Sequence, residues 1–251
     1  DLFDDADRFT SANSISVGRL LPQAVYPFFA YSRVAEYDEP MIASVPSGNF
    51  GDMMGTVVAR EMGLPIERIV CGVNENDEFP QFLNTDVYRV KPSRRSPSSA
   101  MIVSNPSNFA RLIDLYGGHV YDERDETGKV IQEGVMDAPA DLKSMRRDFW
   151  SISVSNPDHY TAIQEVYEQY GIMMEPHGAV GWRALDTFLG GSHDRLAVIY
   201  ETADPGKFPD EVKKAIDVVP DVPERIASQA TLPERIYTID DPPFTREDGS
   251  L

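Results

Sequence analysis

The sequence predicts an α/β fold in which an open, mainly parallel sheet is flanked by helices. The main observation is a strand–loop–helix–strand succession: an apolar run at 41–45, a glycine-containing break at 46–51, a helical pattern at 52–62 and a second apolar run at 69–73. Such a βαβ unit places its two strands parallel and joins them by a right-handed crossover. A third apolar run, at 196–200, predicts another buried strand.

The remaining elements follow from periodicity and from proline and glycine breaks. A helical pattern covers 15–37, and Pro22 and Pro27 are expected to kink or divide it because proline has no backbone N–H to donate. Residues 86–101 are expected to form a loop. Its Ser/Pro/Arg-rich stretch at 91–99 is either a linker or a loop that faces an anion. Further helices are predicted at 109–116, 142–150, 160–170 and 179–189.

Composition narrows the classes of partner. Hydrophobic residues make up 41% of the chain, which is typical of a globular protein. Acidic residues outnumber basic ones by 41 to 23, and the formal charge of −18 argues against nucleic acid and anionic membranes as partners. No apolar run reaches membrane-spanning length. The single cysteine, Cys71, cannot form an internal disulfide, so a cytoplasmic location is expected. A salt-adapted source is another explanation for the acidic surface.

The strongest local pattern is Ser-Gly-Asn-Phe-Gly-Asp at 47–52, between a predicted strand and a predicted helix. Glycines let the backbone turn tightly and expose consecutive N–H groups, and the following helix presents its positive end. Together they form a phosphate cradle that needs no lysine or arginine. The spacing is neither that of a Walker loop nor that of the dinucleotide fingerprint. From this hexapeptide alone, a plain turn capped by Asn49 or Asp52 is an equally good interpretation.

Two further turns carry polar side chains. Thr202 follows the strand at 196–200, at the edge where open α/β sheets bind ligands. Its hydroxyl can hydrogen-bond a neutral ring nitrogen, but from this position alone a threonine that begins a turn is the favoured interpretation. His177, in Glu-Pro-His-Gly at 175–178, is either a catalytic acid–base or a structural hydrogen-bonding residue, and the structural role is favoured. The other histidines lack metal-ligand spacing, so no metal site is predicted.

Taken in order, these motifs resemble those of one known family. Ser-Ala-Asn-Ser-Ile-Ser at 11–16 with Arg-Leu-Leu at 19–21 is similar to a family segment S-A-N-S-I-N-x-x-R-L-L, and 45–52 matches the family's phosphate loop without a change. The series continues at 99–101, 106–111, 175–180 and 202–208. The family is threonine synthase, in the fold-type II group of pyridoxal-phosphate enzymes. The resemblance covers residues 11–209 and leaves the two ends outside it.

The resemblance implies a carbon–oxygen lyase of threonine biosynthesis that converts O-phospho-L-homoserine and water into L-threonine and phosphate. The resemblance also implies pyridoxal 5′-phosphate as the cofactor, with Thr202 facing its pyridine nitrogen. Asp52 is expected to close the phosphate loop. The residues whose backbone amides would hold the cofactor phosphate are Gly48, Asn49, Phe50 and Gly51. The residues that would approach the substrate or its phosphate are Asn13, Ser14 and Arg19.

One family element is missing from this sequence. The lysine that holds the cofactor belongs to an F-K-D-like motif that precedes the position of Asn13 in the family. None of the lysines here has that context: Lys91, Lys129, Lys143, Lys207, Lys213 and Lys214. The catalytic lysine is therefore expected upstream of this chain, in a missing N-terminal part of the same polypeptide, and the isolated chain is expected to be inactive. Residues 1–218 are then the C-terminal part of the cofactor-binding domain, and 219–251 an acidic, proline-rich tail. Asp204 stands where relatives often carry histidine, which puts a general-acid role there in doubt.

Three alternatives remain open at this point. A related phospho-lyase that eliminates phosphate without adding water would carry the same cofactor motifs. A non-catalytic fragment that binds the cofactor or a protein partner would explain the missing lysine. Nucleotide binding through the glycine loop is poorly supported because no P-loop lysine is present. The sequence leaves the oligomeric state undetermined.

Overall fold

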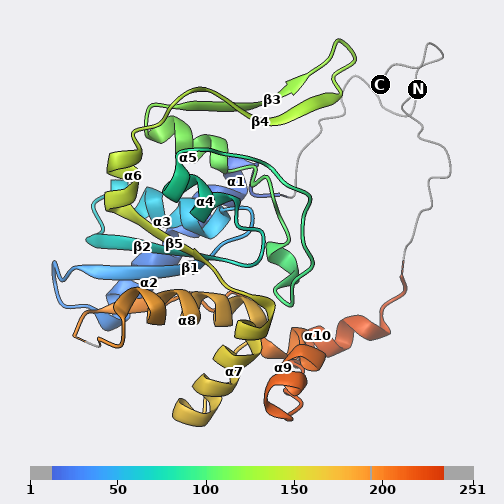
Figure 1. Cartoon of the computed structure of the whole chain (residues 1–251). Coiled ribbons are helices and arrows are strands. Elements are labelled where there is room, and N and C mark those ends of the chain that lie inside the picture. Colours follow the sequence, from blue (N-terminus) through green and yellow to red (C-terminus); the bar gives the residue numbers. More distant parts are fainter. Residues whose placement is uncertain (1–12, 193, 235–251) are drawn as a thin grey trace.

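A computed structural model describes residues 13–192 and 194–234 (Figure 1). Its main sheet has four strands in the order β5-β2-β1-β6, and every neighbouring pair is parallel. The strands are β1 (Met41–Pro46), β2 (Ile66–Val73), β5 (Phe149–Ser153) and β6 (Ala197–Ile199). The predicted fold class, a mainly parallel sheet flanked by helices, is confirmed.

Helices cover both faces of this sheet. In Figure 1, α8 (Pro176–Leu189) lies below the strands, and α3 (Gly51–Glu61), α4 (Glu78–Thr85) and α5 (Phe109–Leu115) lie above them. Because both faces are covered, β1 is buried along its whole length, which explains its uninterrupted apolar run. Phenylalanine rings in edge-to-face contact fill the space above the sheet, including Phe50 against Phe79 with centroids 5.1 Å apart.

The predicted helix at 15–37 is divided into three pieces. They are α1 (Val17–Leu20), the 3₁₀ turn η1 (Leu21–Ala24) and α2 (Val25–Val34). Pro22 lies in the 3₁₀ turn, as expected for a residue that interrupts the helical pattern. Pro27 does not break α2. It lies in the first turn, where backbone N–H groups have no intrahelical acceptor to lose.

Some predicted boundaries were wrong. The helix predicted at 142–150 ends at Asp148 as α6 (Leu142–Asp148), and the next residue already begins β5. This boundary was missed because no glycine or proline separates the two elements. The helix predicted at 160–170 starts earlier, as α7 (Asn156–Tyr170), where the Ser155 side chain caps it by accepting the Asp158 N–H. The helix predicted at 179–189 starts at Pro176, after the cap Glu175. The last predicted strand is only half-buried, since β6 is an edge strand among the described residues.

Some elements were not predicted at all. These are α4, the strand β5, the helix α9 (Pro209–Ile216) and an antiparallel hairpin formed by β3 (His119–Arg124) and β4 (Val130–Ala138). The predicted loop at 86–101 is confirmed except for a 3₁₀ turn, η2 (Ser99–Met101). Downstream of β6 lie the 3₁₀ turn η3 (Pro205–Lys207) and α9 (Pro209–Ile216).

The C-terminal segment contains two short helical turns where the structure describes it. These are α10 (Glu224–Ala227) and η4 (Ser228–Thr231). Residues 11–12 of the first family motif and most of the predicted tail fall outside the described ranges. The division between 218 and 219 stays a prediction. In the described ranges, no helix combines the length and apolar character needed to cross a bilayer.

Close packing of η1 on α3 leads to a prediction at Gly55. A β-carbon added there would lie 2.7 Å from the backbone carbonyl carbon of Gln23, so alanine must push η1 away from α3. We expect Gly55→Ala to lower the free energy of unfolding by about 1–3 kcal/mol in urea titrations. Gly18→Ala is the matched control, because its nearest heavy atom is 3.7 Å away. Equal stability of the two variants would contradict this packing.

Candidate functional site

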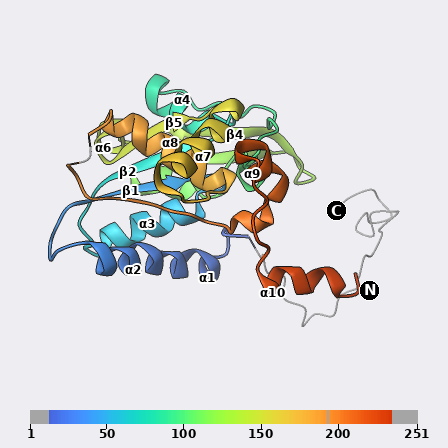
Figure 2. The same cartoon turned by 90° about the horizontal axis from the view of Figure 1, so that it is seen from below.

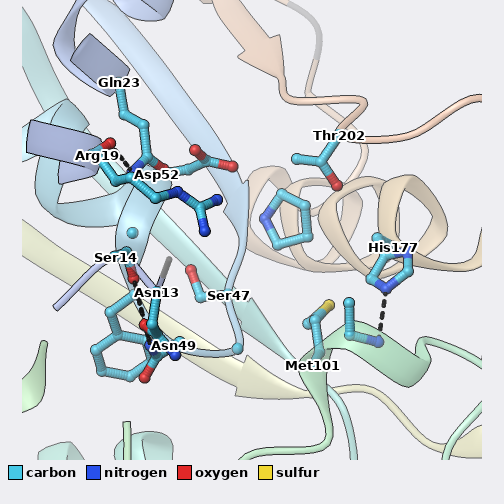
Figure 3. Close-up of a pocket in the computed structure, with 15 residues that line it drawn as sticks. Asn13, Ser14, Arg19, Gln23, Ser47, Asn49, Asp52, Met101, His177 and Thr202 are labelled. Atoms are coloured by element: carbon cyan, nitrogen blue, oxygen red, sulfur yellow. Dashed lines mark hydrogen bonds between the residues drawn. The ribbon is translucent and has the colours of Figure 1, made fainter. Parts of the chain in front are cut away.

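A cavity of about 320 Å³ opens where β1 and β6 end (Figure 3). Carboxyl ends of parallel strands are the usual ligand-binding edge of an open α/β sheet. The cavity brings together every residue that the sequence nominated: Asn13, Ser14, Arg19, Gly48, Asn49, Phe50, Gly51, Asp52 and Thr202. It adds others that sequence reasoning did not nominate for binding: Gln23, Pro46, Ser47, Ala100, Met101 and His177.

The loop after β1 is held in an uncommon backbone conformation. Phe50 has a φ of +62°, in the left-handed region, and its ring is 2% exposed and packed among other aromatic rings. Burial of the ring stabilises a conformation that a non-glycine residue rarely adopts. This residue turns the chain from β1 directly into α3, which has no side-chain cap at its first residue. The positive end of α3 therefore faces the cavity.

The donor groups of this loop suit an anion. The backbone N–H groups of Gly48, Asn49 and Phe50 have no hydrogen-bond acceptor among the residues that the structure describes. Gly48 also lies so close to the neighbouring loop that an added β-carbon would be 2.7 Å from the Met101 Cα. Consecutive unpaired amides beside a helix N-terminus form a phosphate cradle. The phosphate-cradle hypothesis thus gains support over the plain capped turn.

The Asn49 side chain holds this loop in place from behind. Its Oδ1 accepts the Ser107 N–H at 2.6 Å and the Ser107 hydroxyl at 2.9 Å, and its Nδ2 donates to Asn13 Oδ1 at 2.5 Å. Asn108 Nδ2 donates to the Asn49 carbonyl and to the Ser14 hydroxyl, both at 2.8 Å. The side chains of Asn13, Ser14 and Asn49 are therefore used within the protein to position the loop.

Arg111 extends this network to α5. Its guanidinium donates to Asn108 Oδ1 at 2.5 Å and to the Ile15 carbonyl at 2.6 Å. These bonds tie the N-terminal turn of α5 to the segment that begins at Asn13. Sequence reasoning assigned no role to the motif at 106–111. Its partners lie almost a hundred positions earlier in the chain, and only folding brings them together.

His177 lies on the other side of the cavity (Figure 3). Its Nε2 accepts the Ala100 N–H at 3.2 Å, so the ring proton is on Nδ1, which donates to Glu175 Oε2. The Glu175 carboxylate also accepts the N–H groups of His177 and Gly178 and thereby caps α8. With both ring nitrogens bonded, the geometry supports the structural role of His177 over a catalytic acid–base role.

Three polar groups in the cavity have no hydrogen-bond partner in the described part of the chain. They are the Arg19 guanidinium, the Thr202 hydroxyl and the Asp52 carboxyl. Burial raises the pKa of Asp52 above its ordinary value. Arg19 and Asp52 lie on the side of the cavity opposite Thr202 (Figure 3). None of the residues lining this part of the described structure is a lysine.

Glu201, beside Thr202, has an unusual environment. Its Oε1 accepts the Glu175 N–H at 3.0 Å, and its carboxyl end packs against Gly178, although the residue as a whole is exposed. Loss of solvation first, and then the negative charge of Glu175, raise the pKa of Glu201 to about 8.

Known proteins with similar sequences include threonine synthases. Residues 178–245 match a family model described as "Threonine synthase, C-terminal". Threonine synthase of Corynebacterium glutamicum is 32% identical over 243 residues, which cover 93% of this chain and 50% of the relative. The enzyme of Escherichia coli is 30% identical over 224 residues, covering 89% and 46%. Over most of its length, the chain matches the C-terminal portion of the threonine synthase family. The resemblance found in the sequence is thereby confirmed.

Solved threonine synthase structures share the fold. A pyridoxal-phosphate-bound threonine synthase from Brucella melitensis superposes with a TM-score of 0.75 and 29% identity, over 87% of this chain and 47% of that one. The yeast enzyme gives a TM-score of 0.74 and 26% identity, over 88% and 49%. The chain spans about half the length of the curated relatives it matches. It corresponds to their C-terminal portion.

The Asn49 network leads to a stability prediction. Asn49→Ala removes the acceptor of two Ser107 donors and the donor to Asn13, and we expect a loss of about 1–3 kcal/mol in the free energy of unfolding. Urea titration measures the loss. Asn84→Ala, at an exposed position of α4 with no side-chain hydrogen bond in the described structure, is the control. A loss no larger than that of the control would contradict the bracing role.

The raised pKa of Glu201 predicts a pH dependence. Between the ordinary value of 4.5 and about 8, the folded state binds a proton that the unfolded state has released, so stability falls as pH rises through this window. We expect Glu201→Gln to flatten this fall, measured as thermal midpoints between pH 5 and 8. Glu123→Gln, at an exposed position of β3, is the control and should keep the wild-type slope. A Glu201→Gln slope as steep as that of wild type would rule out the shift.

Proposed function

We propose that the polypeptide containing this chain is a threonine synthase that uses pyridoxal 5′-phosphate to convert O-phospho-L-homoserine and water into L-threonine and phosphate. The observation that carries the proposal is that one cavity joins an amide cradle, an arginine and a strand-end threonine, and that neither side chain has a hydrogen-bond partner among the described residues. The family membership and the cofactor named for the Brucella relative support it.

The residues present fit the cofactor. Its phosphate is proposed to rest on the N–H groups at 48–51, where three consecutive amides have no acceptor within the described chain, and Asp52 completes the first turn of α3. The Thr202 hydroxyl, across the cavity, is proposed to donate to the pyridine nitrogen. When bound, pyridoxal phosphate withdraws electrons from the substrate and so eases removal of its α-proton. A hydroxyl partner leaves the ring nitrogen unprotonated and moderates this effect.

Arg19 is the group we propose for direct contact with the substrate's phosphate. Its planar guanidinium matches two phosphate oxygens, and among the described residues it has no carboxylate partner to displace. Asn13 and Ser14 are proposed to act on substrate binding through position, because their side chains hold the loop at Asn49. A positive group is needed at the entrance of a protein whose formal charge is −18.

The lysine that holds the cofactor is proposed to come from the half of the polypeptide that precedes the matched portion. The described cavity contains no lysine that could take this role. The isolated 251-residue chain is therefore proposed to be inactive. A cytoplasmic location remains a proposal, consistent with one buried, unpaired cysteine.

The deciding experiment is intact mass spectrometry of the source polypeptide after incubation with pyridoxal phosphate and reduction by borohydride. We expect one reduced cofactor, attached to a lysine upstream of Asp1. Before reduction, the same polypeptide should release equal amounts of L-threonine and phosphate from O-phospho-L-homoserine. Phosphate released without threonine would replace the proposal with a phospho-lyase. An unmodified chain of 251 residues would show that the activity does not belong to this polypeptide.

Thr202 supplies a sharper prediction. Thr202→Val keeps the shape of the side chain but removes the hydroxyl, and we expect pyridoxal-phosphate affinity of the complete enzyme to fall by up to about tenfold, the value of one hydrogen bond. Equilibrium titration of cofactor absorbance measures this loss. Thr161→Val, at an exposed position of α7, is the matched control. Unchanged affinity in a folded Thr202→Val enzyme would overturn the assignment.

A further inference from the structure

The N-terminal helices carry apolar side chains on their outer side. Val17, Leu21, Val25 and Phe29 recur at four-residue intervals along α1, η1 and α2, and each is 51–61% exposed. We call these four residues the outer stripe. Tyr26, at 56% exposure, borders it. Contiguous apolar surface of this kind usually marks a contact with another polypeptide.

The opposite side of the same helices is also apolar. Leu20, Ala24 and Pro27 are buried, and this side packs on α3. Apart from Ser32 and Arg33, every residue of α2 has an aliphatic or aromatic side chain. A helix that is apolar on both sides belongs in a protein interior rather than on a surface. Figure 2 shows α1 and α2 at the outer margin of the described chain, beyond α3.

We propose that the outer stripe packs against the N-terminal half of the threonine synthase polypeptide, the half that this chain does not match. The relatives that this chain matches along most of its length are about twice as long, so a partner of sufficient size exists in the family. The helix α1 connects the stripe with the cavity, because it carries Val17 of the stripe and also Arg19, which lines the cavity.

This position gives the contact a consequence for the site. A polypeptide seated on the outer stripe contacts α1, the helix that also brings Arg19 to the cavity. The proposed function requires from that polypeptide a lysine that this chain does not supply, and to that extent the inference rests on the proposed function. A second copy of this chain is a poorer occupant. It would bring another formal charge of −18 against the same face and only the same six lysines.

Radical footprinting on two preparations tests the proposal. One is the 251-residue chain alone. In the other, the segment of the C. glutamicum enzyme that precedes its matched half is joined ahead of Asp1, and the E. coli segment is joined in the same way as a second trial. Oxidation of Tyr26 and Phe29 should fall several-fold in the joined polypeptides relative to the chain alone. Oxidation of Tyr170, 46% exposed on α7, should not change.

Variants give a second measurement. Phe29→Asp should lower the thermal midpoint of the joined polypeptide but hardly change that of the chain alone. Ile131→Asp, at a position 59% exposed on β4, should leave both midpoints unchanged. Unchanged oxidation of Tyr26 and Phe29 in both joined polypeptides overturns the proposal. A chain that sediments alone as a dimer, protects these two residues and is dispersed by Phe29→Asp also overturns it, in favour of a second copy.

The outcome is separable from that of the proposed function. Footprinting and thermal midpoints need neither cofactor nor substrate. A covered stripe in a polypeptide that forms no threonine would therefore sink only the proposed function, and an exposed stripe in an active enzyme would sink only the contact.

Discussion

The site depends on one constraint: the chain must turn from β1 into α3 while its backbone amides stay without an acceptor in the described part of the chain. Phe50 makes this turn in a left-handed conformation, and its buried ring is what holds it there. Asn49 fixes the outer side of the turn through Ser107 and Asn13. The amides are available to a ligand because the side chains around them supply the packing and hydrogen bonds that keep the loop open.

The two sides of the cavity are stabilised in different ways. The cradle side is tied to α5 through Asn108 and Arg111, whereas the opposite side is organised by the capping carboxylate of Glu175, which also bonds His177. His177 in turn holds the loop at Ala100. Each side thus has its own support, and the groups left unpaired in the described chain, including Arg19 and Thr202, are those that face the space between them.

The outward apolar side of α1 and α2 and the absence of lysine from the described cavity have one explanation in common. The helix α2 is apolar on its packed side and on its outer side. Exposure of the outer side chains to water costs free energy that burial would recover. Among the residues that the structure describes, the cavity has donors that suit a phosphate but no lysine of the kind that the family uses to hold its cofactor. Both features are explained if the family's other half lies against α1 and α2.

The sequence by itself determined the fold class, because the apolar run of β1 and the glycine loop after it are local patterns. The family resemblance also nominated nine of the fifteen residues that line the cavity, because the motifs at 11–21, 45–52 and 202–208 are each contiguous in sequence, and the roles of these nine residues stay predictions. Only the tertiary structure decided that β5 follows α6 without a break, and that Asn108 and Arg111 brace the loop. Those contacts join residues far apart in the chain, and hydrogen bonds between distant segments leave no periodic trace in a single sequence.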